Sequence, residues 1–232
     1  MKKTLIAAAL AAMAVSPAYA LDPSVPANAP SYIIYAAGGS AQANAVYFAA
    51  SKLLSSMDYI TDGACGTNSG NYRVLLGSST AALTGVTVGT PVLFYYKFNG
   101  GSVPNGVNPQ GLGSQLPFPH LVIGASTNTA ACTGASLPLP TFSFTGTITF
   151  DQAVPDWGVS DEEVGLLNFP DNQPPVSQPL GSPPVLGTPL SNSALANITH
   201  NGIYENLFGV AVTNNLFSAS GHPKTSFTKQ EV

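Results

Sequence analysis

The chain of 232 residues carries few charges: 8% of its residues are Asp, Glu, Lys or Arg, and the formal net charge is −4. Clustered Lys and Arg are absent, which excludes nucleic acid and anionic membrane surfaces as expected partners, because both select basic patches. The 23 glycines and 20 prolines instead suit an exported protein rich in loops and short strands.

The first twenty residues have the three parts of a secretory signal peptide. Lys2 and Lys3 give a positive start, Leu5–Val15 an apolar stretch, and Ala18-Tyr19-Ala20 the small-x-small pattern that signal peptidase reads. The apolar stretch is shorter than the roughly 20 residues that span a bilayer, and no later segment is long and apolar enough to do so. We therefore expect cleavage after Ala20, a periplasmic or secreted location, and no membrane insertion of the processed chain.

A strand, a glycine turn and a helix are predicted next. Residues 21–31 hold three prolines, which block helix and ladder pairing, and so predict an extended leader. Tyr32–Ala36 is a β-branched and aromatic run that predicts a buried strand. Gly38-Gly39-Ser40 ends this strand, and Ser40 stands in the N-cap position of a helix predicted over Ala41–Met57. The expected buried face of the helix comprises Ala45, Phe48, Ala49, Leu53 and Met57.

The middle of the chain alternates strands with Gly- and Pro-rich loops. Strands are predicted over residues 72–76 and 92–97, and the second runs straight into the glycine-serine loop Asn99-Gly100-Gly101-Ser102. Short strands are expected around residues 120–123 and within 142–150. The sequence thus predicts an α/β fold, with a mixed sheet flanked by helices and long Pro/Gly-rich loops.

Three features mark the later part of the chain. A short apolar run over 154–159 ends at Ser160-Asp161, where a hydroxyl and a carboxylate are adjacent. Residues 171–190 contain six prolines and predict an irregular surface segment. Residues 206–212 return to an apolar β pattern before a polar tail.

The sequence contains two cysteines, Cys65 and Cys132. A pair of cysteines in an exported protein is most simply explained by a disulfide, because the compartment is oxidising. Neither has a His or a second Cys at metal-ligand spacing, so no metal site is predicted.

Polar groups at strand ends are the candidate binding residues. Gly38-Gly39-Ser40 opens a helix, whose unpaired N–H groups and partial positive charge suit an oxyanion, but the same pattern also fits an ordinary turn with an N-cap. Ser160-Asp161 fits either a helix cap or a carboxylate that accepts a hydrogen bond from a protonated ligand such as hydrogen phosphate. Spacing alone does not choose between these alternatives.

Catalytic patterns are weak or missing. No Gly-x-Ser-x-Gly elbow occurs, and His120, His200 and His222 lie far apart without metal-ligand spacing. The sequence therefore predicts no enzyme and no cofactor.

The order of the segments resembles the type 2 periplasmic solute-binding proteins, in particular the phosphate-binding components of ABC transporters. Ile33–Gln42 matches the opening strand and Gly-x-Ser/Thr loop of that family, and Asn99–Gly106 matches its Gly-Ser-Gly-type loop before a second helix. Asp156–Asp161 matches an Asp-Phe-Gly-x-Ser-Asp-like segment, and Gly209–Asn214 an apolar hinge strand. The resemblance implies the first lobe of a periplasmic-binding-protein-like fold over residues 32–232.

The resemblance also implies a ligand site and partners. The implied ligand-binding residues are Gly39, Ser40, Gly101, Ser102, Ser160 and Asp161. The two loop serines would donate hydrogen bonds with the nearby backbone amides, Asp161 would accept one from a protonated oxyanion, and Ser160 would support it. Phosphate or another small oxyanion is the implied ligand, and an ABC transporter permease is the implied partner. Val103-Pro104 departs from the family's glycines and removes one backbone donor.

Proteins of this family bind by closing two lobes around the ligand. Residues 206–232 fit the hinge strand and the start of a second lobe that is missing, so impaired binding is expected. A structural or adhesive surface protein, favoured by low charge and high Gly, Pro, Thr and Ser content, is the alternative, and a secreted hydrolase is a third. Convergence of Ser40, Ser102 and Asp161 on one sheet edge favours binding, whereas an all-β sandwich favours adhesion.

Overall fold

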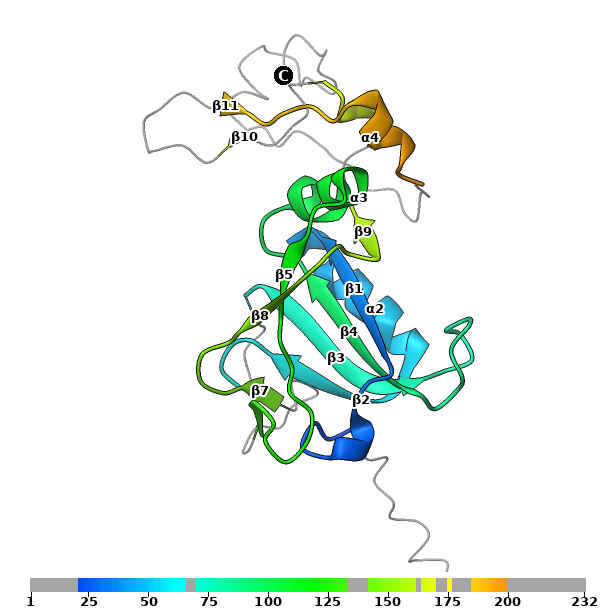
Figure 1. The fold of residues 1–232 in the computed structure, drawn as a ribbon, viewed down its shortest axis with the longest axis vertical. Helices are drawn as coiled ribbons and strands as arrows, with labels where there is room; N and C mark the ends of the chain where they lie inside the picture. Colours follow the sequence, from blue (N-terminus) through cyan, green and yellow to red (C-terminus); the bar gives the residue numbers. More distant parts are fainter. Residues whose placement is uncertain are drawn as a thin grey trace, which may run out of the picture. The chain divides into compact units, whose positions relative to one another are not determined.

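The computed structural model describes residues 21–65, 70–132, 142–161, 164–169, 175–176 and 185–199, drawn in colour in Figure 1. The predicted signal peptide and the predicted hinge strand at 206–212 lie outside these residues. All of the described residues belong to one unit, which ends at Thr199.

The structure contains β-strands and a few short helical segments. The strands are β1 (Tyr32–Gly38), β2 (Leu54–Thr61), β3 (Tyr72–Ser79), β4 (Pro91–Lys97), β5 (Leu116–Pro119), β6 (Thr129–Ala131), β7 (Phe142–Phe144), β8 (Phe150–Ala153), β9 (Trp157–Val159), β10 (Pro175–Val176) and β11 (Val185–Leu186). The helical segments are η1 (Pro26–Asn28), η2 (Ser40–Gln42), α2 (Ala43–Leu53), the π-helical η3 (Val103–Val107), α3 (Asn108–Leu112), η4 (Val164–Leu166) and α4 (Asn192–Ala196).

Seven strands form one mixed sheet in the order β6-β7-β2-β3-β4-β1-β9. Strand β1 pairs in parallel with β4 on one side and with β9 on the other. Strand β3 runs antiparallel to both β2 and β4, while β2 pairs in parallel with β7. The predicted α/β class, with a mixed sheet flanked by helices, is confirmed at this level.

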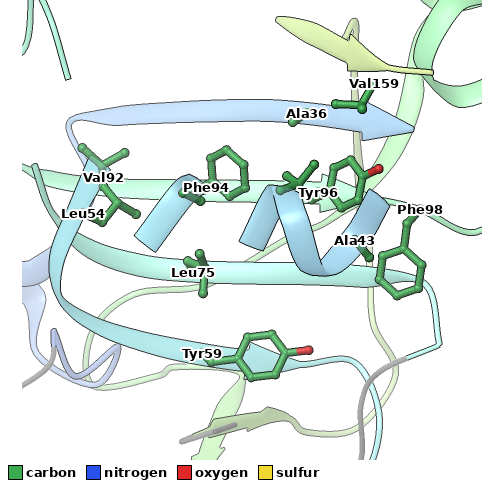
Figure 2. Packing of buried hydrophobic residues seen from close by; sticks show 12 residues of the cluster. Ala36, Ala43, Leu54, Tyr59, Leu75, Val92, Phe94, Tyr96, Phe98 and Val159 are labelled. Atoms are coloured by element: carbon green, nitrogen blue, oxygen red, sulfur yellow. The ribbon is translucent and has the colours of Figure 1, made fainter. Parts of the chain in front are cut away.

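Helix α2 covers one face of the sheet (Figure 2). Because side chains alternate along a strand, Val92, Phe94 and Tyr96 of β4 all point to this face. Ala43, Val46 and Ala50 of α2 pack against them, together with Leu75 of β3 and Tyr59 of β2. Figure 2 shows these side chains between the helix and the strands.

The opposite face carries an aromatic cluster under the antiparallel pair β5–β8, which Figure 1 shows in front of the sheet. Leu93 and Tyr95, the alternate residues of β4, point this way. Phe118 of β5 is fully buried among Tyr35, Tyr72 and Tyr95, with ring centroids 4.7, 6.4 and 5.8 Å from its own. The sheet is therefore covered on both faces, which explains why β4 is apolar over Val92–Tyr96 and buried along that run.

A third, smaller cluster fixes the helical segment that follows β4. Val103 and Val107 of η3 pack with Leu167, Leu190 and Ala194. The segment from η3 to α3 is thereby held against α4.

The predicted helix over Ala41–Met57 was wrong in its end and in its buried face. The helix ends at Leu53, and Met57 lies in strand β2. Val46 and Ala50 are buried with Ala43, whereas Phe48 is 62% exposed and Ala45 and Ala49 face solvent. The Ala-rich composition fits both faces equally well, so tertiary packing decided which one is buried. Ser40 is also not the N-cap, because Gly39 occupies that position before η2.

Two other segments differ locally from the sequence prediction. The segment 21–31, predicted to be extended, contains the 3₁₀ turn η1, and its Leu21 amide donates to Ser56 O at 3.1 Å. The strand expected around 120–123 was wrong: those residues form no strand, and β5 lies just before them and ends at Pro119. Proline content identified the irregular backbone but not the turn within it.

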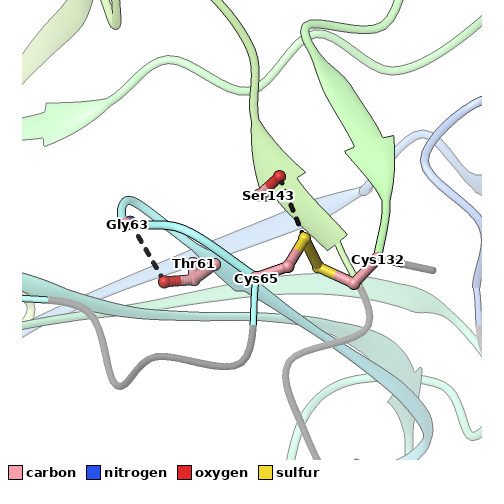
Figure 3. Close-up of a disulfide and its surroundings, with 5 residues drawn as sticks. All are labelled: Thr61, Gly63, Cys65, Cys132 and Ser143. Carbon is pink, nitrogen blue, oxygen red and sulfur yellow. Dashed lines mark hydrogen bonds between the residues drawn. A yellow bond between two sulfur atoms is a disulfide. The ribbon is translucent and has the colours of Figure 1, made fainter. Parts of the chain in front are cut away.

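The predicted disulfide between Cys65 and Cys132 is confirmed (Figure 3). It joins the loop after β2 to the residue after β6, and Ser143 Oγ of β7 lies 3.5 Å from Cys65 Sγ. The two cysteines are 67 residues apart, so in the chain-entropy account the bond stabilises the fold by up to about 4 kcal/mol. Among the described residues, no helix is both long and apolar enough to cross a bilayer.

The buried phenol of Tyr72 makes stability depend on pH in the alkaline range. Burial, with a smaller contribution from the charge of Asp62, raises the pKa of Tyr72 to about 12, and its hydroxyl donates to Pro117 O at 2.9 Å. The unfolded chain loses this proton near pH 10, so the stabilisation present below about pH 10 is lost as pH rises towards about 12. We expect Tyr72→Phe to make the free energy of unfolding fall less steeply over this range in urea titrations. The exposed Tyr32→Phe is the control, and equal slopes for the Tyr72 variant and the parent protein would contradict the prediction.

Candidate functional site

Three adjacent parallel strands end at the same edge of the sheet. In the pairing register, Ala37 of β1 lies beside Lys97 of β4, and Gly38 beside Val159 of β9. Figure 2 shows Val159 at the arrowhead of β1, with Tyr96 and Ala43 at the same end. The two glycine-serine loops and the Ser160-Asp161 pair therefore emerge side by side, in the position where open α/β sheets bind ligands.

Gly39 lies in contact with the second glycine-serine loop. A Cβ built on Gly39 would lie 3.2 Å from Ser102 Cβ and 3.4 Å from Ser102 N. The buried hydroxyl of Tyr96, on β4, donates to Gly39 O at 2.8 Å. A side chain at Gly39 would fill the space between the loops, so glycine here lets the backbones of the two loops approach closely.

Ser102 and Asp161, both predicted as ligand-binding residues, are brought together directly. The Ser102 hydroxyl donates a hydrogen bond to the carboxylate of Asp161, across 59 residues of sequence. Ser102 is partly buried, and Asp161 is exposed. A donor and a charged acceptor thus face each other beside Gly39, where ligand atoms can take the place of either partner.

The other predicted residues lie at the same sheet edge with less contact. Ser40 is exposed, and within the described part of the chain its hydroxyl forms no hydrogen bond. Gly101 is exposed and has a φ of 95°, which favours glycine at that turn. Ser160 directly follows β9 and is partly buried. Each of the three is adjacent in sequence to another residue of the site: Ser40 to Gly39, Gly101 to Ser102, and Ser160 to Asp161.

Asn105 fixes the second loop to the first and was missed by sequence reasoning. Its side chain is buried, and its Nδ2 donates to Asn99 O at 2.9 Å and to Gly38 O at 3.3 Å. The carbonyl groups at the ends of β4 and β1 are therefore joined by one carboxamide. No local sequence pattern distinguishes this asparagine from any other polar residue of a loop.

Gln42, also missed, is the unusual residue of the site. Its side chain is only 2% exposed, yet in the described structure neither Nε2 nor Oε1 has a hydrogen-bond partner. A Cβ on Gly39 would lie 2.5 Å from Gln42 Oε1, so the carboxamide borders Gly39 on the side where Ser102 also approaches. Leaving such a group buried and unpaired costs about 1–3 kcal/mol. The position of Gln42 as the third residue after the N-cap was the available signal, because Gln there can return to the cap.

Two cations lie in the strands beneath the site. Lys97 at the end of β4 donates to Asn99 O at 3.2 Å, and burial lowers the pKa of its ammonium group while Asp62 opposes that shift. The buried Arg73 of β3 donates to Tyr59 Oη at 2.7 Å and to Asn44 Oδ1, in the first turn of α2, at 3.4 Å. Positive charge thus adds to the partial charge of the helix start at this end of the sheet.

Within the described ranges, no group of three or more His, Cys, Asp or Glu side chains is arranged to hold a metal ion. His120 lies away from this edge, on the residue after β5, and its Nδ1 is 2.7 Å from Asp151 Oδ2 of β8. Asp161 accepts the hydrogen bond from Ser102.

In comparisons with known proteins, no family model, no curated protein and no solved structure matches the chain.

The position of Ser160-Asp161 depends on close packing of β9 against η3. A Cβ on Gly158 would lie 1.7 Å from Gly106 O, so Gly158→Ala must push β9 away. We expect this variant to lose about 1–3 kcal/mol of unfolding free energy, measured by urea denaturation. Gly70→Ala is the matched control, because a Cβ there meets nothing within 4 Å. Unchanged stability of the Gly158 variant would show that the packing is not as described.

Proposed function

We propose that the chain is an exported binding domain, with the first-lobe arrangement of a solute-binding protein, that takes phosphate or a similar small oxyanion at the ends of β1, β4 and β9. The observation that carries the proposal is the Ser102–Asp161 hydrogen bond beside Gly39, formed by loops that follow three adjacent parallel strands. A purely structural or adhesive protein has no need for this convergence of polar groups at one sheet edge.

The chemistry of binding follows from the donors and the acceptor at this edge. A carboxylate can only accept, so Asp161 requires a ligand with a proton on an oxygen. When that O–H donates to Asp161, the Ser102 hydroxyl is released and can donate to another ligand oxygen. The exposed Ser40 hydroxyl adds a second donor. The ligand thus replaces one charge-assisted hydrogen bond, Ser102 to Asp161, by several charge-assisted hydrogen bonds.

The wider role is proposed from the resemblance to solute-binding proteins. A domain of that kind delivers its ligand to an ABC transporter permease in the periplasm. The Cys65–Cys132 disulfide is compatible with such a compartment, because disulfides form and persist where the surroundings are oxidising.

A phosphate titration followed by NMR of the purified protein tests the binding proposal. Because Asp161 is exposed to water, we expect weak binding, with a Kd between about 10 μM and about 1 mM. Ser102→Ala should weaken binding about tenfold, since a hydrogen bond to a charged group contributes about 1.5–3 kcal/mol. Ser114→Ala, an exposed serine beyond α3, is the matched control and should bind as the parent protein does.

Sulfate provides the second arm of this experiment. Sulfate carries no proton at neutral pH, so the carboxylate of Asp161 repels it, and the parent protein should prefer phosphate. Asp161→Asn removes the charge and should narrow that preference. No shift at the loops after β1, β4 and β9 with either anion would overturn the proposed function.

A further inference from the structure

The carboxamide of Gln42 is buried, and no hydrogen bond within the described residues explains its burial. Both of its terminal atoms are buried and unpartnered within the described residues, although native proteins pair almost all such groups. The capping role open to a Gln at this position is a hydrogen bond back to the N-cap amide. Gln42 Oε1 does lie against the N-cap Gly39, but it forms no hydrogen bond there.

The location of the carboxamide points to the ligand site. Gln42 Oε1, Ser102 Cβ and Ser102 N all lie within 3.4 Å of one point, the position that a Cβ of Gly39 would occupy. The Ser102 hydroxyl is bonded to Asp161, so it is the group that must move to meet a ligand. The exchange of Asp161 for a ligand as the partner of Ser102 therefore takes place beside the Gln42 amide, whose donors and acceptor are unpaired among the described residues.

Resting on the proposed function, we infer that Gln42 is a specificity-determining ligand contact of this site. Its Nε2 donates to an unprotonated ligand oxygen, and its Oε1 accepts from a protonated one. With Asp161, the site then holds two acceptors for ligand protons and several donors for bare oxygens. This set fits a small oxyanion with protonated and bare oxygens on one centre, of which monoanionic phosphate is the simplest example.

Gln42→Leu separates a ligand contact from a structural role. The substitution removes an unpaired buried polar group and keeps an apolar stem of similar size, so we expect equal or higher stability in urea denaturation. Phosphate affinity should fall about tenfold, as expected for loss of hydrogen bonds to a charged ligand. A capping residue would give the reverse pattern, with lower stability and unchanged affinity, and that result would overturn the inference.

Gln110→Leu is the matched control for stability. Gln110 Nε2 donates to Pro155 O at 2.7 Å, so removal of this partnered carboxamide should lower stability. If Gln42→Leu does not fold, the side-chain amide resonances of Gln42 in the parent protein decide the matter: they must shift on addition of phosphate.

The outcomes distinguish this inference from the proposed function. Absence of phosphate binding by the parent protein would remove both. Phosphate binding that Ser102→Ala weakens, with Gln42 resonances and Gln42→Leu affinity unchanged, would leave the proposed function standing and overturn the role of Gln42 alone.

Discussion

The parallel pairing of β1 between β4 and β9 is the constraint on which the rest of the structure depends. Parallel neighbours end at the same edge, so the residues that follow them are brought together whatever their separation in sequence. The pairing itself relies on close backbone approach: a Cβ on Gly38 would lie 2.4 Å from Val159 O, and one on Gly158 only 1.7 Å from Gly106 O. Strand β9 is only three residues long and forms a short pairing with β1, so its close packing against Gly106 also helps to hold Asp161 in place.

Most of the polar side chains discussed at this edge form hydrogen bonds to neighbouring segments, whereas the buried Gln42 does not. Tyr96, Asn105 and Ser102 all donate to acceptors on neighbouring segments, which fixes the two loops relative to β1. Gln42, equally buried, has no such partner among the described residues. A group that is left unpaired in a well-bonded setting raises the energy of the free protein, and a ligand that pairs with it recovers that energy. On the proposed function, the resting Ser102–Asp161 bond and the unpaired amide would gain hydrogen bonds when an oxyanion binds.

Sequence reasoning predicted strands better than helices and loop chemistry. Tyr32–Gly38 and Pro91–Lys97 are compact runs rich in β-branched and aromatic residues, which favour strands, and both were found close to their expected bounds. The helix after β1 was misplaced because Ala residues pack on either face, and Leu54 begins a strand whose pairing with β3 is not visible locally. Ser102 and Asp161 could be chosen because hydroxyls and carboxylates after strands are recognisable. The partners of Asn105 and the isolation of Gln42 depend on tertiary contacts, which no local pattern contains.

The central claim is that the loops after β1, β4 and β9 form one oxyanion site. The most direct measurement is an anomalous difference map from a crystal of the protein soaked in arsenate, a protonated oxyanion with a strong anomalous signal. The account predicts a peak whose oxygens lie within hydrogen-bond reach, about 3 Å, of Ser102 Oγ, the Asp161 carboxylate and the Gln42 carboxamide. A fully occupied peak elsewhere on the protein, with the Ser102–Asp161 bond intact, would contradict it.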